Sequence, residues 1–236
     1  MGRAIILLAL LAPIYAEDMA PPALTTDEIV NRMISADAAR MPRLKEYTSI
    51  RHYSLVNTRF ETKAAMTVRM VYRRPGVKEF EILEQSGPGP VRTKVFKRML
   101  DSEKEASNGA ARAETQISPR NYAFRLLESK DVDGRKCFVL EAEPKTKNKL
   151  LFRGRVFIDA EDFAVARIEG SPAQSPSFWV TKTEFVHKYK KFGPFWLAVS
   201  NESDTDVRIF GRTRVSINYG EYAIQGEEEH AQQVSR

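Results

Sequence analysis

Residues 152–170 read FRGRVFIDAEDFAVARIEG, and this stretch decides the fold class. Two apolar segments, Gly154 to Asp159 and Phe163 to Gly170, flank the residues Asp159-Ala160-Glu161-Asp162. Asp side chains favour turns because they hydrogen-bond to the backbone nearby. The stretch therefore predicts two short β-strands that are joined as an antiparallel hairpin.

The same pattern continues on both sides of this hairpin. One further hairpin is predicted from the strands Tyr122 to Ser129 and Cys137 to Glu143, which flank the turn residues 131–134 (DVDG). Another is predicted from the strands Ser177 to Tyr189 and Phe195 to Ser203, which are joined by residues 190–194 (KKFGP). Repeated hairpins of this kind predict an antiparallel sheet.

One long final strand is predicted from about Asp206 to Tyr222. Its apolar residues are expected on one face, namely Val207, Ile209, Val215, Ile217 and Tyr219. Asp204-Thr205-Asp206 lacks the glycine and the distal glutamate of a calcium loop, so we interpret it as a hairpin turn before that strand.

The N-terminal strands are predicted from a period of two that begins at Tyr47. Met66, Val68, Met70 and Tyr72 alternate with other side chains along one strand. Pro75-Gly76 then turns the chain into a further strand, which carries Phe80 and Ile82 on one face.

Two amphipathic helices interrupt this β pattern. The first has a capping box at Thr25 and Glu28, an apolar stripe that includes Met33, and an end before Pro42. The second is predicted over residues 91–106, between SGPGP at 86–90 and the stop signal Asn108-Gly109, and its apolar residues include Phe96 and Met99.

The predicted fold class is mainly β (α+β), with one strongly curved antiparallel sheet. Each helix has one apolar stripe that needs a surface to cover, so both are expected on the concave side of the sheet. No linker separates two cores, and residues 17–236 are therefore expected to form a single domain.

Residues 1–16 are predicted to be a secretory signal peptide. Arg3 gives a positive start, residues 4–12 (AIILLALLA) are apolar, and Ile14-Tyr15-Ala16 precede the expected cleavage site. The apolar run is about half as long as a membrane-spanning helix needs to be. No cysteine follows the run, so an N-terminal lipid anchor is not expected, and the mature chain should be exported and soluble.

Composition gives little support for an enzyme or a metalloprotein. The chain has 236 residues, a formal net charge of +6, one cysteine and three histidines, His52, His187 and His230, with no metal-ligand spacing. No G-x-S-x-G motif occurs. We expect no enzyme activity, no metal and no cofactor, and an enzyme of unrecognised chemistry stays the alternative.

The mildly basic balance does not indicate nucleic-acid binding, because 31 acidic residues are spread among 37 basic ones. Arg208, Arg212 and Arg214 are interpreted as a solvated strand face. The alternative is that these arginines meet anionic lipid or an acidic partner.

Three C-terminal segments carry a resemblance to a known family. Residues 152–159, 164–170 and 193–197 (GPFWL), together with the order of helices and strands, resemble outer-membrane lipoprotein-sorting proteins of the LolA/LolB-like superfamily of periplasmic lipoprotein carriers. The resemblance implies an unclosed β-barrel in which a helical lid covers a cavity for acyl chains. It also implies a location in the periplasm, acylated lipoproteins or lipids as cargo, and transport components of the inner and outer membranes as partners.

On this basis a hydrophobic trough is predicted on the concave face, with the helices as its lid. The candidate ligand-binding residues are Met33, Met66, Val68, Met70, Tyr72, Phe80, Ile82, Phe96, Met99, Phe138, Leu140, Trp179, Phe185, Ile209, Val215 and Ile217. Sheet periodicity does not separate such a trough from a filled core, so both readings stay open. The expected function is a carrier without covalent chemistry, and a sensor or scaffold of the same fold is the alternative.

Overall fold

The computed structural model of the chain describes residues 24–107, 113–148, 150–175, 178, 180–209 and 211–225. The predicted signal peptide and its cleavage site lie outside the described residues, as do Trp179 and the stop signal Asn108-Gly109. In the described part of the chain, no helix is long and apolar enough to cross a membrane.

The first helix, α1 (Thr26–Arg40), begins with the predicted capping box. The Glu28 backbone N–H donates to Thr25 Oγ1, and the Glu28 carboxylate accepts from the Thr25 backbone N–H at 2.8 Å. These bonds satisfy donors that the first helical turn leaves free. The helix buries Ile29, Val30 and Met33, and a short turn η1 (Met41–Arg43) leads from it into the sheet.

Ten antiparallel strands follow, and the second helix interrupts them. The strands are β1 (Glu46–Asn57), β2 (Thr62–Arg73), β3 (Val77–Ser86), β4 (Tyr122–Val132), β5 (Arg135–Pro144), β6 (Phe152–Asp159), β7 (Val165–Pro172), β8 (Val180–Phe192), β9 (Phe195–Val207) and β10 (Gly211–Gln225). Between β3 and β4 lie one π-helical turn, η2 (Val91–Phe96), and α2 (Lys97–Ala106), which together match the predicted second helix.

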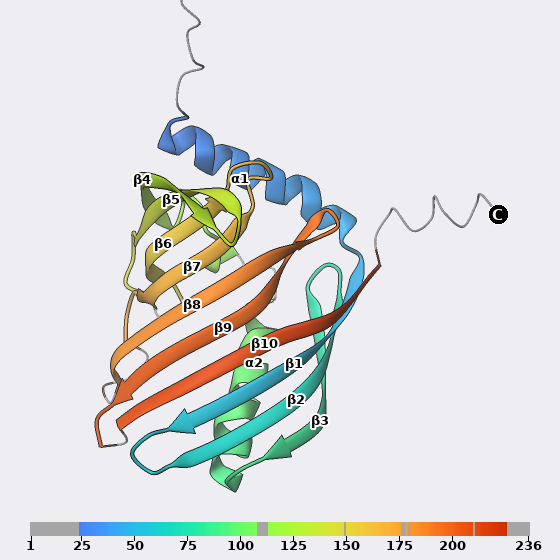
Figure 1. Cartoon of the computed structure of the whole chain (residues 1–236), viewed down its shortest axis with the longest axis vertical. Helices are drawn as coiled ribbons and strands as arrows, with labels where there is room; N and C mark the ends of the chain where they lie inside the picture. Colours follow the sequence, from blue (N-terminus) through green and yellow to red (C-terminus); the bar gives the residue numbers. More distant parts are fainter. Residues whose placement is uncertain are drawn as a thin grey trace, which may run out of the picture.

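The strands form one sheet in the order β3-β2-β1-β10-β9-β8-β7-β6-β5-β4 (Figure 1). Most neighbours are sequential hairpins, but the first strand pairs with the last, from Glu46 opposite Gln225 to Asn57 opposite Thr213. In the described residues β3 and β4 are the outer strands and do not pair with each other. The sheet is therefore an unclosed barrel, as predicted.

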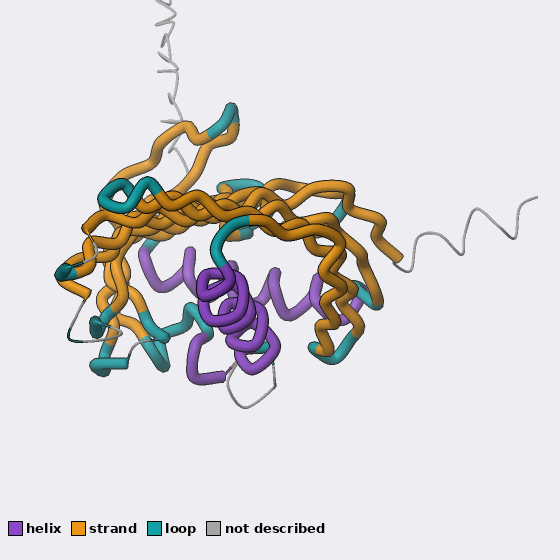
Figure 2. The backbone as a smooth tube through the Cα atoms, turned by 90° about the horizontal axis from the view of Figure 1, so that it is seen from below, coloured by secondary structure: helices purple, strands orange, loops and turns teal. Residues whose placement is uncertain are grey.

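Both helices lie on the concave side of the curved sheet, which Figure 2 shows from below. Ile29 and Met33 of α1 pack in one core cluster with Tyr122 and Leu140. Phe96 of η2 packs in another, which also contains α2, β1, β2 and β10 residues. The apolar stripe of each helix thus finds the surface that the sequence pattern requires.

The prediction for the last strand is wrong at its start. Asp204 to Asp206 lie inside β9, and the chain turns at 208–209 before β10 begins at Gly211. Val207 pairs with Gly211, and both Ile209 (φ 68°) and Gly211 (φ 70°) are left-handed, as tight turns require. Because apolar residues alternate on both sides of this turn, the pattern resembled one continuous strand.

Candidate ligand-binding site

A cavity of about 520 Å³ lies between the concave face of the sheet, the end of α2 and the segment that joins α1 to β1. Its apolar lining includes Met41, Leu44 and Leu197. Arg51, Lys78 and Glu103 form its charged part. The volume falls in the range of small-molecule sites.

A second cavity of about 240 Å³ adjoins the first beneath α1. The two share the lining residues Met41, Leu44, Tyr189, Trp196 and Leu197, so they lie along one trough. Met33 and Ile34 of α1 and Ile168 of β7 line the smaller cavity. The trough therefore has an apolar end under α1 and a more polar end beside α2.

Five tyrosines line the larger cavity, and they come from strands far apart in the sequence: Tyr47, Tyr72, Tyr189, Tyr219 and Tyr222. The Tyr47 and Tyr72 rings stack with centroids 5.0 Å apart. Burial raises the pKa of Tyr47 and that of Tyr189 to about 12, so both phenols are neutral at physiological pH. Such side chains offer an apolar ring together with a hydroxyl that can hydrogen-bond.

Arg51 of β1 places a charge on the concave face, where only 2% of the residue is exposed. Its Nη1 lies 2.7 Å from Glu103 Oε2 of α2, and Lys78 Nζ of β3 lies 2.8 Å from Glu103 Oε1. The guanidinium also lies over the Tyr219 ring, 4.9 Å from its centroid. Side chains from β1 and from the outer strand β3 thus both pair with the same carboxylate on α2.

The Glu103 carboxylate stays ionised in this setting. Burial by itself would raise the pKa of Glu103, but Lys78 and Arg51 outweigh it and hold the pKa below its usual value. Burial likewise opposes the charge of Arg51, yet Glu103 raises the Arg51 pKa overall. The three charges therefore stabilise one another within the trough.

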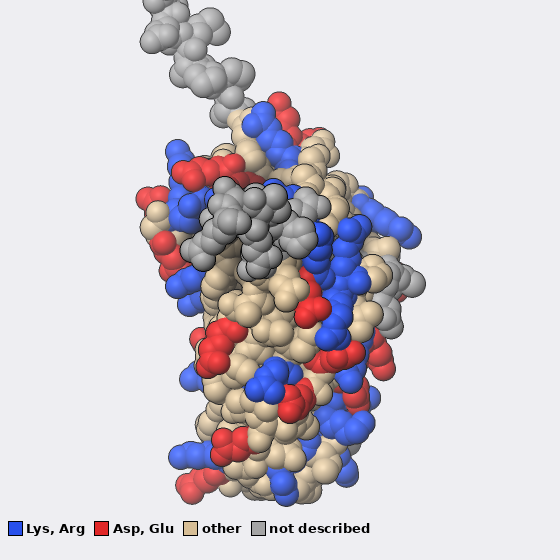
Figure 3. Space-filling view, turned by 90° about the vertical axis from the view of Figure 1, so that its right-hand side faces the viewer, with Lys and Arg blue, Asp and Glu red and all other residues tan. Residues whose placement is uncertain are grey.

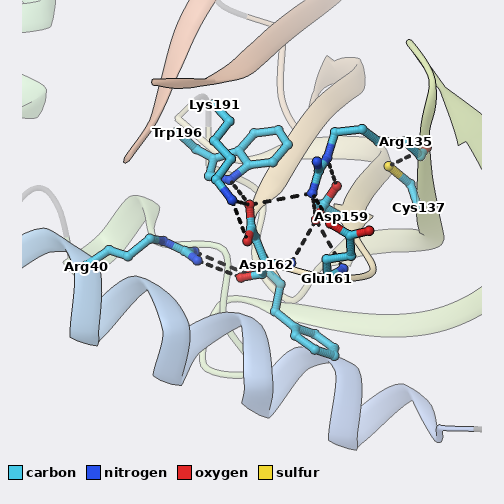
Figure 4. A network of polar contacts seen from close by, with 9 residues as sticks. Arg40, Arg135, Cys137, Asp159, Glu161, Asp162, Lys191 and Trp196 are labelled. Carbon is cyan, nitrogen blue, oxygen red and sulfur yellow. Dashed lines mark hydrogen bonds and ion pairs between the residues drawn. The ribbon is translucent and has the colours of Figure 1, made fainter. Parts of the chain in front are cut away.

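The C-terminal end of α1 is held by the β6–β7 turn (Figure 4). Arg40 Nη1 donates to the Asp162 carbonyl at 2.6 Å. The Asp162 carboxylate accepts from Trp196 Nε1 at 2.9 Å and lies 2.8 Å from Lys191 Nζ. Because Trp196 also lines both cavities, this network joins the position of α1 to the wall of the trough.

The one cysteine is buried, and His187 is partly buried. Burial first and then Asp159 raise the pKa of Cys137 to about 11, so its thiol is protonated at neutral pH. Burial lowers the pKa of His187 to about 4, partly opposed by a hydrogen bond with Asn201. Among the residues that the structure describes, no three His, Cys, Asp or Glu side chains are gathered as a metal ion needs.

The predicted trough residues fall into four groups. Met33 and Tyr72 line the cavities. Ten others belong to the core clusters beneath the helices: Met66, Val68, Met70, Phe80, Phe96, Phe138, Leu140, Phe185, Val215 and Ile217. Met99 is partly buried in the same packing against α2. The third group, Ile82 and Ile209, is exposed, and the fourth, Trp179, lies outside the described residues.

The prediction that Ile209 lies on a strand face beside Val215 is wrong. It lies in the β9–β10 turn with 59% of its surface exposed, and the turn directs it away from the core. Ile82 lies on the outer strand β3, where no further described strand covers it.

The charged and tyrosine lining was missed by sequence reasoning. Arg51 lies with Ser49, Tyr53 and Leu55 on the buried face of β1, so a charge on an apolar face was the available signal. Glu103 gave no such signal, because α2 is rich in charged residues and the partners of Glu103 come from two other elements.

By its fold the protein is an open antiparallel half-barrel. Two helices cover its concave face, which is partly hollow. No family model matches the chain, and no curated protein matches it significantly. Among solved structures, a LolA superfamily protein from Nitrosomonas europaea is 9% identical with a TM-score of 0.45, covering 88% of this chain and 97% of its own.

Two further solved structures have a similar chain path. A DUF1329 family protein from Desulfovibrio piger is 12% identical with a TM-score of 0.44, covering 85% of this chain and 93% of its own. A candidate outer-membrane lipoprotein-sorting domain from Vibrio parahaemolyticus is 12% identical with a TM-score of 0.40, covering 87% and 98%. These likenesses concern the fold and assign no function to this chain.

Proposed function

We propose that this protein is a carrier that binds the acyl chains of lipids or lipoproteins in the concave trough, without covalent chemistry. The observation that carries the proposal is the cavity of about 520 Å³ with its apolar extension under α1. A sheet and helices that only formed a packed core would leave no space of this size, since cores are packed to crystal density.

The physical basis is the removal of hydrocarbon from water. Each CH₂ group that enters the trough gains about 0.8 kcal/mol, so a chain of ordinary length is held firmly without any bond being formed. Release then requires only a host that is more apolar than the trough. In this proposal Met33, Ile34 and Ile168 contact the acyl chain, and the charged part of the cavity meets the polar end of the cargo.

The trough residues predicted from sequence enter this proposal in two roles. Met33 and Tyr72 contact the ligand, whereas residues such as Phe96 and Met66 fasten η2 and α2 to the sheet. We further propose that α2 is the part of the lid that moves, because α1 is tied to the β6–β7 turn through Arg40. The chain is proposed to act in the periplasm after export, as a single domain, with no cofactor and no enzymatic step.

Native mass spectrometry of gently purified protein tests this function first, because co-purified acylated species would be observed directly. A fluorescent fatty acid then reports binding in solution. Leu197→Trp should fill the cavity and weaken binding at least tenfold, whereas Leu83→Trp on the exposed face of β3 should leave binding unchanged. Thermal melts of both variants confirm that they are folded.

Two outcomes would exclude the carrier function. One is a wild-type protein that neither carries acylated species nor binds the probe. The other is equal binding by the Leu197→Trp and wild-type proteins, which would place the probe outside the trough.

A further inference from the structure

The loops that connect the strands at one end of the sheet contain different kinds of residues from the loops at the other end. In an antiparallel sheet alternate connections share an end. Four of them form what we call the hairpin rim, whose described residues are 58–61, 145–148, 150–151, 173–175, 178 and 208–209. In Figure 1 this rim runs along the left-hand ends of the strands, where the β1 and β9 arrows end. The opposite rim consists of the connections 74–76, 133–134, 160–164 and 193–194.

Each connection of the hairpin rim presents a large apolar side chain to solvent. The exposed fractions are 74% for Phe178, 59% for Ile209, 56% for Phe60 and 51% for Leu150. At the opposite end Val77, the first residue of β3, is 52% exposed, but the opposite-rim connections themselves, all of which are described, have no exposed large apolar side chain. Since single exposed apolar residues are ordinary, the meaningful observation is that four of them lie on the same rim.

The connections of the two rims also differ in the charged residues that they contain. The described residues of the hairpin-rim connections include four basic side chains, Arg59, Lys145, Lys147 and Arg208, against the acidic Glu61. The opposite-rim connections have three acidic side chains, Asp133, Glu161 and Asp162, against Arg74. Figure 3 views the molecule from the right-hand side of Figure 1, away from the hairpin rim, and there basic and acidic side chains are interspersed.

The four connections are also contiguous in space. The Thr58 backbone N–H donates to the Arg212 carbonyl at 3.1 Å, which joins the β1–β2 turn to β10. The Arg208 guanidinium lies 4.5 Å from the centroid of the Phe178 ring, which joins the β9–β10 turn to the β7–β8 connection. The Ala173 backbone N–H donates to the Leu151 carbonyl at 2.8 Å and adds the β5–β6 connection.

We propose that the hairpin rim docks this protein on an anionic lipid bilayer. Aromatic and aliphatic side chains at loop tips can enter the boundary between head groups and acyl chains, and arginines beside them can reach the phosphates. Arg59 lies over the Phe60 ring at 5.8 Å as Arg208 does over Phe178, so two of the tips combine a ring with a cation.

A bilayer fits this rim better than an acidic protein does. The apolar side chains occur one per loop tip and are separated by polar backbone turns, so they do not form the continuous apolar core of a protein interface. The inference is independent of the carrier function. Tyr72 and Trp196, which line the trough, lie at the strand ends near the opposite rim.

Co-sedimentation with vesicles tests the proposal. The full chain should bind vesicles of phosphatidylcholine with 30% phosphatidylglycerol, as roughly that anionic fraction suffices to attract basic segments, and should bind pure phosphatidylcholine far more weakly. Phe60→Ser, Phe178→Ser and Ile209→Ser combined should weaken binding at least tenfold. Arg59→Gln with Arg208→Gln should weaken it about fivefold for each arginine removed.

Matched variants elsewhere on the surface are the controls. Ile82→Ser with Leu83→Ser removes exposed apolar side chains from β3, and Arg69→Gln with Arg73→Gln removes two exposed arginines from β2, away from the hairpin rim. Both controls should bind anionic vesicles as the wild type does, and melting temperatures show that every variant is folded. The proposal is overturned if the wild type does not bind these vesicles, if the rim and control variants lose binding equally, or if the rim captures only an acidic protein.

Discussion

Arg51 carries a positive charge on the buried face of β1. Alternation along β1 puts Arg51 on the same face as Tyr53 and Leu55, and both of these residues are buried. The same face holds a buried guanidinium whose partner Glu103 lies 52 positions further along the chain. Periodicity identifies the buried face of a strand but not the charge on another element that makes a buried arginine tolerable.

Replacement of Glu103 by Gln should destabilise the protein by about 2 kcal/mol, because Arg51 would stay buried without a counter-charge. The value is reduced from that of a fully buried pair because 27% of the Glu103 side chain is exposed. Urea denaturation of wild type and variant measures the difference. Asp101→Asn, which breaks the exposed pair with Lys97 on the same helix, should cost less than 0.5 kcal/mol. Equal losses in the two variants would contradict this role.

His187 should make stability fall as the pH falls from 6.5 towards 4. The folded protein holds its pKa at about 4, below the usual 6.5, so the unfolded chain binds the proton first and is favoured in this window. At pH 4 the contribution lost is at most about 3 kcal/mol. The free energy of unfolding against pH, compared with His187→Gln, isolates this effect from the carboxylates.

At the scale of elements, local sequence signals located the helices and most hairpins. The Thr25 and Glu28 capping box gave the start of α1, and Gly193-Pro194 gave the β8–β9 turn. The β9–β10 turn was missed, because Ile209 takes a left-handed conformation that a β-branched residue seldom adopts. The network that holds α1 could not be predicted either, since Arg40, Asp162 and Trp196 come from three distant segments.

A reversible link between α2 and β3 should abolish uptake of a fluorescent fatty acid if α2 moves to admit ligand. Lys104 Nζ lies 5.7 Å from the centroid of the Phe80 ring, so Phe80→Cys and Lys104→Cys can be joined by a cleavable bis-maleimide in a Cys137→Ser background. Binding should return when the linker is cleaved. A link between Arg69→Cys and Glu81→Cys, whose side chains meet across β2 and β3, is the control and should leave uptake intact. Equal uptake by the linked and cleaved forms would show that α2 does not open.

At the scale of the whole molecule, the sequence indicated a curved antiparallel sheet but not its strand order. Hairpins are local, whereas the pairing of β1 with β10 joins segments such as Tyr53 and Ile217 that no turn connects. No local pattern in the sequence therefore predicts that β10 lies in the middle of the sheet. The size of the trough was equally hidden, because it depends on how far the helices stand from the sheet.

Ser216→Pro should unfold most of the chain, since Ser216 pairs with Ser54 on one side and with Glu202 on the other. A proline there removes a ladder hydrogen bond from a central strand and should cost about 3 kcal/mol or more. If residues 17–236 form one domain, circular dichroism and tryptophan fluorescence should report a single shared transition. Leu127→Pro, at the irregularity of the outer strand β4, should be tolerated much better. Two separate transitions would indicate two folding units.

The pairing of β1 with β10 also decides when folding can finish. A chain that emerges N-terminus first forms β1 to β3 early, but the open side of β1 stays without its partner until Gln225 has emerged. Until then β1 is an unprotected edge, and such edges recruit other chains into aggregates. Newly made protein therefore passes through a vulnerable interval as long as the synthesis of most of its length, during which a holding chaperone would protect it most.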